Sequence, residues 1–304
     1  MPASHQKRYL VQSMNEKKYR YSEIFGQTIQ GEGQFTGRPT AWLRVWGCNF
    51  ECAGFGQDTP EDPSTYDLDH QNIDPSAYKA MEELPVFHRG CDSSYSWAKK
   101  FSHLAHQDTA ADICTNIEAV LPGGKFLHPQ SKQWTHMAFT GGEPMMSQTA
   151  IVDVMENFAL RNNTPKYITI ETNGTQKPRP AFENLFANHD GELFWSVSPK
   201  LYLSGEMWDN AIKPEVLAHY RDISRAGQLK FVSNGTDRSW DEVARATDLF
   251  RKAGIEWDVW IMPVGADREM QESHQAKITE MAVERGYSVA ARVHTWIFGN
   301  VIGK

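Results

Sequence analysis

Three cysteines have sequence surroundings that suit an iron–sulfur cluster better than a disulfide or a hydrophobic core. Cys48 and Cys52 lie in the segment Gly-Cys-Asn-Phe-Glu-Cys, and Cys91 follows Gly90 after 38 intervening residues. Three thiolates can bind three irons of a four-iron cluster and leave the fourth iron open to a ligand from outside the protein. The spacing therefore predicts one 4Fe–4S cluster bound by Cys48, Cys52 and Cys91.

A second use of the same cysteines is a structural zinc site. In that alternative Cys48, Cys52, His88 and Cys91 bind one zinc ion tetrahedrally, and the chain is a zinc-stabilised binding protein. This alternative leaves the glycine- and proline-rich segments described below without a role. The fourth cysteine, Cys114, lies among apolar residues at helical spacing, which predicts a small buried core thiol.

The elements that must position these residues alternate between extended apolar runs and runs of helical period. The predicted strands are Thr40–Trp46, His136–Thr140, Tyr167–Thr172, Leu193–Ser198, Gln228–Ser233, Trp257–Met262 and Ser288–His294. The predicted helices are Thr109–Leu121, Gln148–Arg161, Glu215–Ala226, Asp241–Lys252 and Glu269–Arg285. This alternation predicts an α/β fold with parallel strands joined by helices. A full or partial α/β barrel and a doubly wound open sheet both fit the pattern.

Polar and glycine-rich clusters follow five of the predicted strands, where an α/β fold places its chemistry. They are Gly47-Cys48, Thr140-Gly141-Gly142-Glu143-Pro144, Glu171-Thr172-Asn173-Gly174-Thr175, Ser196-Val197-Ser198-Pro199-Lys200 and Met262-Pro263-Val264-Gly265. A single cluster of this kind is an ordinary turn. Five at corresponding strand ends predict one cleft lined by many strands.

The composition favours an enzyme with a large core. The chain has 304 residues, four cysteines and a formal net charge of −7, a combination that argues against a disulfide scaffold and against a general nucleic-acid surface. Residues 1–20 carry several basic side chains but no apolar run long enough for a signal peptide or a membrane span. We expect a polar extension over 1–20, a catalytic domain over 21–304 and a cytoplasmic location.

The segment 53–90, between the second and third cysteines, interrupts the alternating pattern. It contains four prolines and eight acidic residues against Lys79 and Arg89. Such a composition is typical of an exposed insertion or a small lid. An insertion packed on the surface is the slightly favoured interpretation, and the other is a cover that keeps water and oxygen from the cluster.

The motifs above, with those given at the end of this paragraph, occur along the chain in an order that resembles the 7-carboxy-7-deazaguanine synthases of the QueE type. This family belongs to the radical S-adenosylmethionine superfamily. The resemblance runs from about Tyr21 to the C-terminus, and the superfamily's chemistry requires an iron that is open to a ligand from outside the protein. It implies a full or partial (βα)6-type radical SAM barrel with an insertion inside the cluster motif. The motifs are Gln30-Gly31-Glu32-Gly33, Leu43-Arg44-Val45-Trp46-Gly47-Cys48-Asn49-Phe50, Cys91-Asp92-Ser93, Thr140-Gly141-Gly142-Glu143-Pro144, Glu171-Thr172-Asn173-Gly174-Thr175, Ser198-Pro199-Lys200 and His294.

The resemblance also shows where this chain departs from the superfamily. The usual cysteine spacing is C-x3-C-x2-C, but the position three residues after Cys52 is Phe55, which cannot bind iron. The residues expected after the third cysteine follow Cys91 instead, so the insertion splits the motif. The residue before the third cysteine is Gly90 rather than an aromatic, so the group that packs on the adenine must come from elsewhere. Ser93 stands where the family has a threonine that binds magnesium, and it keeps the hydroxyl, so the resemblance implies a Mg²⁺ ion at Ser93.

The resemblance assigns two further groups of residues. Gly141 and Gly142 expose backbone to S-adenosylmethionine, and Glu143 can accept hydrogen bonds from its ammonium group. Gln30 and Glu32 can pair with the edge of a pterin. Arg44 offers a planar fork to a carboxylate and His294 a second donor. The full implied cofactor set is Gly141, Gly142, Glu143, Asn173, Ser198, Pro199, Lys200, Met262 and Pro263, and the substrate set is Ile29, Gln30, Gly31, Glu32, Arg44, Thr140 and His294.

The implied reaction is the conversion of 6-carboxy-5,6,7,8-tetrahydropterin to 7-carboxy-7-deazaguanine with loss of ammonia, in the biosynthesis of 7-deazapurines such as the queuosine precursor. It proceeds through a 5′-deoxyadenosyl radical, so no side chain need act as a nucleophile. The resemblance also implies a reductant such as flavodoxin and a homodimer, with no nucleic acid or membrane as partner. A radical SAM enzyme acting on another substrate is the remaining alternative.

Overall fold

The fold is a nine-stranded sheet with helices on its outer face, in a computed structural model that describes residues 17–266, 268–299 and 301–303. The strand order is β3-β1-β2-β4-β5-β6-β7-β8-β9. The strands are β1 (Lys18–Ile29), β2 (Pro39–Val45), β3 (His106–Thr109), β4 (His136–Gly141), β5 (Tyr167–Thr172), β6 (Glu192–Val197), β7 (Gly227–Ser233), β8 (Asp258–Pro263) and β9 (Ser288–Val289). No pairing joins β9 to β3 among the described residues, so the sheet is a partial barrel.

Seven of these strands run parallel, from β2 through β4 to β9, as the alternating pattern predicts. The predicted strand Ser288–His294 is shorter than expected, because the chain after Val289 leaves the sheet and His294 lies in a helix. Two strands were not predicted. β1 pairs antiparallel with both β2 and β3 at one edge of the sheet, and this arrangement places the 30–44 region beside the first cysteine loop.

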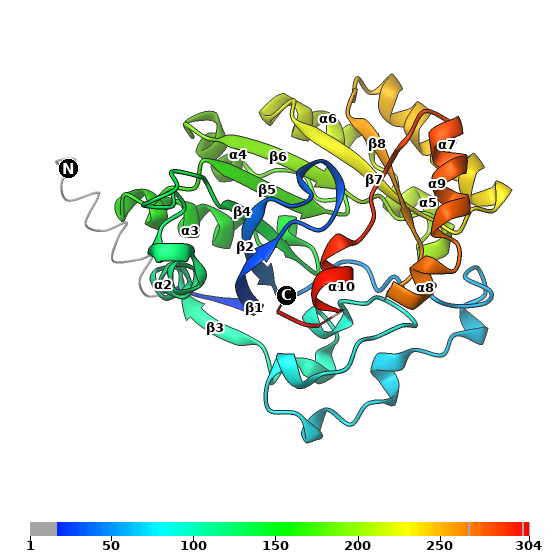
Figure 1. Cartoon of the computed structure of the whole chain (residues 1–304), viewed down its shortest axis with the longest axis horizontal. Coiled ribbons are helices and arrows are strands. Elements are labelled where there is room, and N and C mark those ends of the chain that lie inside the picture. The colour runs from blue at the N-terminus through cyan, green and yellow to red at the C-terminus, as the bar shows by residue number, and fades with distance from the viewer. Residues whose placement is uncertain (1–16, 267, 300, 304) are drawn as a thin grey trace.

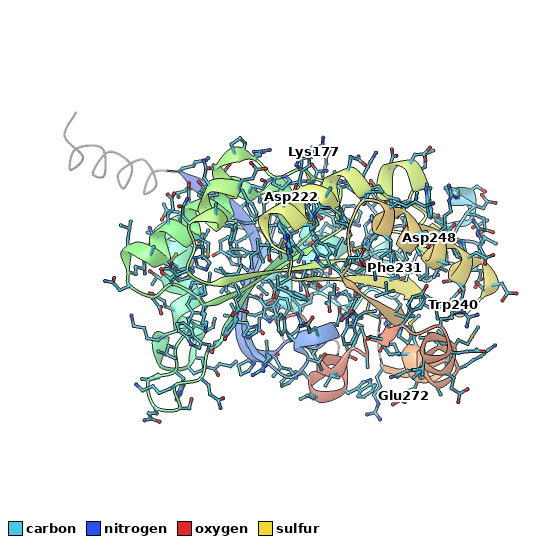
Figure 2. All side chains as sticks on the ribbon, turned by 90° about the horizontal axis from the view of Figure 1, so that it is seen from above. Lys177, Asp222, Phe231, Trp240, Asp248 and Glu272 are labelled. Carbon is cyan, nitrogen blue, oxygen red and sulfur yellow. The ribbon has the colours of Figure 1, made fainter. Side chains whose placement is uncertain are left out.

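The helices confirm most of the predicted helical runs. They are α2 (Ala110–Val120), α3 (Gln148–Leu160), α4 (Pro180–Ala187), α5 (Trp208–Ala211), α6 (Pro214–Ile223), α7 (Asp237–Lys252), α8 (Arg268–Glu272), α9 (Gln275–Glu284) and α10 (Val293–Phe298). The run Glu269–Arg285 is divided into α8 and α9. Figure 2 shows the sheet nearly edge-on, with the green and yellow helices along one face and the blue and red segments on the other.

Alternation along the strands separates the two faces of the sheet. On β7, Leu229 and Phe231 are fully buried in the main core. The intervening Lys230 lies on the other face and lines the pocket described below. We call the face that carries Lys230 the inner face. Toward the amino ends of the strands it is covered by the loop after β1, where the Phe35 ring packs edge-on against His136 and Phe194. The pocket on this face is lined by residues at the carboxyl ends of the strands.

The insertion between the second and third cysteines has a core of its own. It contains four short 3₁₀ helices, Pro63–Thr65, Asp69–Asn72, Pro75–Ala77 and Met81–Glu83. Met81, Leu84 and Phe87 are buried against Phe101 and Leu104 of the segment that follows the third cysteine. In Figure 1 the insertion forms the cyan loops at the lower edge, with α10 near the centre. It is packed rather than a loose loop.

The polar extension expected over residues 1–20 lies mostly outside the described residues. Lys18, Tyr19 and Arg20 belong to β1, and Tyr19 is buried in the main core. The first strand of the sheet therefore begins before residue 21. No helix in the part of the chain that the structure describes is long and apolar enough to cross a membrane.

Candidate active site

A pocket of about 270 Å³ opens at the carboxyl ends of the parallel strands. Its lining includes all three predicted cluster cysteines and all seven predicted substrate residues, together with Ser93. It also includes most of the predicted cofactor residues: Gly141, Gly142, Asn173, Ser198, Lys200, Met262 and Pro263. Glu143 and Pro199 lie outside the lining. Segments up to 269 residues apart in sequence thus meet in one cavity, since Phe25 and His294 share it.

The loop that carries Cys48 and Cys52 is fixed by backbone hydrogen bonds at both ends. Gly47 donates its N–H to the Ser96 carbonyl at 2.9 Å, and its own carbonyl accepts the Glu143 N–H at 2.8 Å. At the other end, one carboxylate oxygen of Glu206 accepts the N–H groups of Glu51 and Cys52 at 3.0 and 2.9 Å. Cys52 has a left-handed φ of 49°, a conformation that side chains other than glycine seldom adopt without such support.

Cys91 is brought to this loop by a hydrogen bond that closes the insertion at its base. Gly90 donates its N–H to the Phe55 carbonyl at 2.7 Å, so residues 56–89 leave and return at one point. Phe55 and Cys91 then pack together with the other two cysteines in one apolar cluster. The structure therefore rejoins the split cysteine motif in space, as the sequence interpretation requires.

The donor set fits an iron–sulfur cluster. Burial raises the pKa of the Cys48 thiol to about 12 and also raises the pKa values of Cys52 and Cys91, so these groups need a bound cation to become thiolates. No three His, Cys, Asp or Glu side chains in the described ranges converge on a single metal ion. His88 lines the same pocket as these three cysteines. Metal analysis of the purified protein therefore separates the zinc alternative from the cluster.

Gly141 and Gly142 form the wall beside the first cysteine. A Cβ on Gly142 would lie 2.2 Å from the Gly47 carbonyl oxygen and 2.9 Å from the Cys48 Cβ. A Cβ on Gly141, whose φ is 138°, would lie 2.4 Å from the Val45 carbonyl oxygen. Any side chain here would displace the cysteine loop, so the bare backbone is a requirement of the site.

Glu143 differs from its expected role. Its side chain is fully buried, and its carboxylate accepts hydrogen bonds from the Met145 N–H, the Thr172 hydroxyl and the Asn173 N–H at 2.9, 2.6 and 2.7 Å. Burial raises the pKa of Glu143 although these hydrogen bonds oppose the shift. Glu143 therefore joins the loops after β4 and β5, and it does not face the pocket to receive an ammonium group.

The loops after β5 and β6 continue the same wall. Asn173 donates from its side-chain amide to the Asn49 side-chain oxygen at 3.0 Å, which ties the β5 loop to the cysteine loop. Lys200 donates to the Ser198 hydroxyl at 3.2 Å, and its ammonium lies 5.9 Å from the centre of the Phe55 ring. These contacts place a hydroxyl, an amide, a cation and an aromatic ring around the mouth of the cysteine cluster.

The opposite side of the pocket holds the predicted substrate residues, beginning with Gln30. The Gln30 side-chain amide donates to Glu171 at 3.1 Å, and its oxygen accepts the Glu32 N–H at 3.0 Å. The second oxygen of Glu171 accepts the Thr140 hydroxyl at 3.1 Å. Because both ends of the Gln30 amide have partners, its orientation in the pocket is fixed.

Glu32 is paired with two cations that sequence reasoning missed. Lys230 from β7 donates to one carboxylate oxygen, and Arg292 lies 3.1 Å from the other. Burial favours the protonated carboxyl, but Lys230 and Arg292 together hold the pKa of Glu32 well below its usual range. Burial likewise favours the neutral amine of Lys230, while Glu32 and Glu171 keep its pKa above the usual value. All three side chains are therefore charged at neutral pH.

Arg44 presents the far end of its guanidinium to the pocket. Its Nε donates to Glu23 at 2.5 Å, and its guanidinium carbon lies 5.6 Å from the centres of the Phe25 and Tyr95 rings. Tyr95 donates to the same Glu23 oxygen at 3.1 Å. A guanidinium held at Nε keeps its terminal nitrogens available for a planar anion.

His294 extends from α10 into the pocket and lies against the backbone of Gly31. A Cβ on Gly31 would lie 1.8 Å from the His294 Nδ1, and the Val293 N–H donates to the Gly31 carbonyl at 2.9 Å. Burial first, and the neighbouring Arg292 and Lys230 second, lower the pKa of His294 to about 4, although Glu32 opposes this. At neutral pH the ring is therefore uncharged and can both donate and accept.

The oxygens around Ser93 do not fit a magnesium ion well. The Ser93 hydroxyl donates to Asp92 at 3.2 Å, and the other Asp92 carboxylate oxygen lies 3.1 Å from Arg292. On its far side, Ser93 accepts from Arg44 at 3.5 Å. Two guanidinium groups thus contact the oxygens that a metal ion would use.

Sequence reasoning missed six polar residues of this pocket: Asp92, Glu171, Thr172, Ser196, Lys230 and Arg292. A signal for Lys230 was present, because it is a charged residue between Leu229 and Phe231 in a strand otherwise read as buried. Glu171 stands in a strand end that was already noted. Arg292 had no local signal, because only the fold brings it next to Glu32 and Asp92, which are far away in the sequence.

The chain is similar in sequence to curated proteins along nearly its whole length, although no protein-family model matches it. A protein of Rhodopirellula baltica named 7-carboxy-7-deazaguanine synthase is 25% identical over 300 residues, which are 94% of this chain and 89% of that protein. A protein of Halobacterium salinarum with the same name is 25% identical over 92% of this chain and 90% of that protein. A Bacillus cereus protein of that name is 24% identical over 51% of this chain and 44% of that protein.

Two matches among solved structures cover about half of this chain. Streptococcus suis SuiB bound to precursor peptide SuiA has a TM-score of 0.36 at 14% identity, covering 53% of this chain and 39% of that chain. Native anSMEcpe with bound AdoMet has a TM-score of 0.36 at 13% identity, covering 55% of this chain and 54% of that chain. The motif resemblance to 7-carboxy-7-deazaguanine synthases is confirmed by the long sequence matches.

Proposed function

We propose that this protein is a 7-carboxy-7-deazaguanine synthase that uses radical S-adenosylmethionine chemistry on 6-carboxy-5,6,7,8-tetrahydropterin. The observation that carries the proposal is that three cysteines from a split motif line the same pocket as Gln30 and Arg44. The synthases named above match this chain over up to 94% of its length, which supports the same assignment.

The cysteine side of the pocket would hold the cofactors. Cys48, Cys52 and Cys91 would bind a 4Fe–4S cluster, and S-adenosylmethionine would lie against Gly141 and Gly142. When bound, these groups supply hydrogen-atom abstraction driven by one electron, and the protein fixes the geometry. In place of Glu143, the lining that can contact the cofactor is formed by Asn173, Ser198 and Lys200, with Met262 and Pro263 from β8.

The Gln30 side of the pocket would hold the substrate. Gln30 and Glu32 offer hydrogen-bond acceptors and a fixed amide to the edge of the pterin ring. Arg44 offers its terminal nitrogens to the substrate carboxylate, and the neutral His294 adds a donor or acceptor that brings no further charge. The Phe35 ring covers one end of the inner face, and the loops that line the pocket cover the other end. Together they would keep the substrate away from water.

The remaining parts of the proposal concern partners and class. The reaction releases ammonia and would class the enzyme as a carbon–nitrogen lyase. A homodimeric state, an electron donor such as flavodoxin and a cytoplasmic location complete the proposal. Light scattering of the purified protein and turnover with reduced flavodoxin would test the first two.

The deciding experiment is anaerobic purification with iron, sulfide and zinc analysis, followed by assay of the pterin. We expect about four irons per chain, a visible spectrum bleached by dithionite, and formation of 7-carboxy-7-deazaguanine. Cys91→Ala should lose the cluster and the activity. Cys114→Ala is the matched control, because Cys114 is a buried cysteine in α2 and should leave the iron content unchanged.

Two other results would redirect the assignment. Colourless protein with one tightly bound zinc would overturn the radical chemistry and favour a zinc-stabilised binding protein. An iron–sulfur protein that cleaves S-adenosylmethionine but whose pterin turnover is unchanged in Arg44→Ala would keep the radical chemistry and overturn the substrate. The second case would indicate a radical SAM enzyme acting on another molecule.

A further inference from the structure

Arg292 is held in place by three different segments of the chain. Its Nε lies 3.1 Å from Glu32, one terminal nitrogen donates to the Ala266 carbonyl at 3.0 Å, and the other lies 3.1 Å from Asp92. Its side chain is 11% exposed. These contacts fix the Arg292 cation in the pocket wall, since moving it would leave several buried groups without partners. A guanidinium carries five N–H donors, so the terminal nitrogens of Arg292 keep donors for a ligand.

Asp92 and Ser93 lie between this cation and a second one. Arg292 contacts one Asp92 carboxylate oxygen, and Arg44 contacts the Ser93 hydroxyl at 3.5 Å. All four side chains line the main pocket, and Arg44, Asp92 and Ser93 also border a smaller pocket of about 60 Å³. The oxygens that a divalent cation would need are therefore already in contact with positively charged guanidinium groups.

Magnesium binds proteins through carboxylate oxygens and retains several waters, so its affinity depends on uncompensated negative charge. Here the Asp92 carboxylate is compensated by Arg292, and Glu32 by Arg292 and Lys230. A dication beside Ser93 would face two guanidinium groups at close range, while the Asp92 and Glu32 carboxylates are already paired. The pocket instead offers two guanidinium groups whose remaining N–H donors can pair with a carboxylate.

We infer that Arg292 takes the place of a divalent metal ion in this protein, so that Arg44 and Arg292 together bind the substrate carboxylate. This inference rests on the proposed function, because it assumes that the substrate is the carboxylated pterin. It assigns Arg292 as a binding residue, and it makes turnover independent of Mg²⁺.

The first test measures turnover of the cluster-loaded enzyme in metal-depleted buffer, with Mg²⁺ added or with a chelator. We expect equal rates, and a stimulation of about tenfold or more by Mg²⁺ would overturn the inference. Arg292→Gln should raise the KM for the pterin at least about tenfold and should introduce a dependence on Mg²⁺. Arg268→Gln is the matched control, because Arg268 is exposed in α8 and its removal should change neither parameter.

The second test does not depend on turnover or on a variant that folds. Electron paramagnetic resonance would follow Mn²⁺ binding to the wild-type holoenzyme, with the cluster in its oxidised, diamagnetic state and the pterin present. We expect no more Mn²⁺ bound than in the same protein without the pterin. Stoichiometric Mn²⁺ binding that requires the pterin would overturn the inference. If no pterin is turned over under any condition, the proposed function fails and the inference fails with it, whereas pterin turnover that requires Mg²⁺ overturns the inference alone.

Discussion

At the scale of single residues, the orientation of Arg44 depends on Glu23. The Glu23 side chain is 2% exposed on β1 and pairs with Arg44 directly across the antiparallel ladder with β2. Removing one partner of a buried ion pair leaves the other charge uncompensated. We expect Glu23→Gln to lower the free energy of unfolding by about 3 kcal/mol and to raise the KM for the carboxylated substrate, as measured by denaturant unfolding and steady-state kinetics.

The exposed pair Arg268–Glu272 provides the control for that substitution. Both side chains are more than half exposed, so Glu272→Gln should change the free energy of unfolding by less than about 1 kcal/mol. Equal effects of the two substitutions would show that the Glu23–Arg44 pair contributes no more than a surface contact.

A second residue-level prediction concerns Glu206, which holds the cysteine loop without touching a sulfur. Its carboxylate accepts the N–H groups of Glu51 and Cys52, and Cys52 has a left-handed backbone. We expect Glu206→Ala to lower the iron content below the wild-type value, as measured by iron analysis and visible absorbance, because the loop loses two hydrogen bonds. Glu118→Ala removes a hydrogen-bonded carboxylate on α2 and should retain the iron. Full iron content in Glu206→Ala would contradict this role.

Residue identities that face the pocket could be predicted where a short motif carried them. Gln30, Arg44 and the three cysteines stand in segments whose spacing already indicated chemistry, and all of them line the pocket. Arg292 and Glu206 could not be found in this way, because their partners in the site are far away in the sequence and only the fold brings them together. The role expected for Glu143 failed for a physical reason: a carboxylate beside three donors from the protein is occupied before a ligand arrives.

At the scale of elements, the insertion is stabilised by its own apolar contacts. Phe87 is 1% exposed and its ring lies 5.9 Å from that of Phe101. Removing a buried ring typically costs about 3–5 kcal/mol in the local core. We expect Phe87→Ala to make residues 57–88 sensitive to limited proteolysis, as located by mass spectrometry, while iron remains bound.

The reason for expecting retained iron is that the cysteines are fixed outside the insertion core, at Gly90 and Glu206. Leu160→Ala, which removes a side chain that is 51% exposed, should leave the cleavage pattern unchanged. Loss of iron together with cleavage in Phe87→Ala would mean that the insertion core itself holds the third cysteine.

The seven parallel strands could be predicted because buried strands read as short apolar runs separated by helical segments. β1 and β3 could not, because β1 mixes polar and apolar residues over twelve positions with two irregularities in its register. β3 consists of four polar or exposed residues that only pairing with β1 makes extended. Local pattern carries little information for strands at a sheet edge.

At the scale of the whole molecule, two histidines whose pKa values are lowered by burial make stability depend on pH. His136 is 5% exposed between the rings of Phe35 and Tyr167, and burial, with a smaller contribution from Arg38, lowers its pKa to about 4. His294 has a similarly lowered pKa. The unfolded chain, with histidine pKa values near about 6.5, binds more protons between these values, so stability is lost as the pH falls through that window.

We expect His136 alone to contribute a loss of about 2 kcal/mol between neutral pH and about pH 5. His136→Phe retains the ring packing and removes the titrating group, so its free energy of unfolding should fall less steeply over this range. Denaturant unfolding at both pH values measures the difference. Identical pH slopes for wild type and His136→Phe would contradict the assignment.

The hydrogen bond between Gly90 and Phe55 gives the chain a seam at which residues 56–89 begin and end. A stretch of sequence gained at such a seam leaves Cys48, Cys52 and Cys91 where they were, because the hydrogen bond closes the insertion at its base. Searches that require contiguous cysteine spacing would overlook chains with such an insertion. The same seam gives protein engineers a position at which one inserted peptide can be exchanged for another beside the pocket.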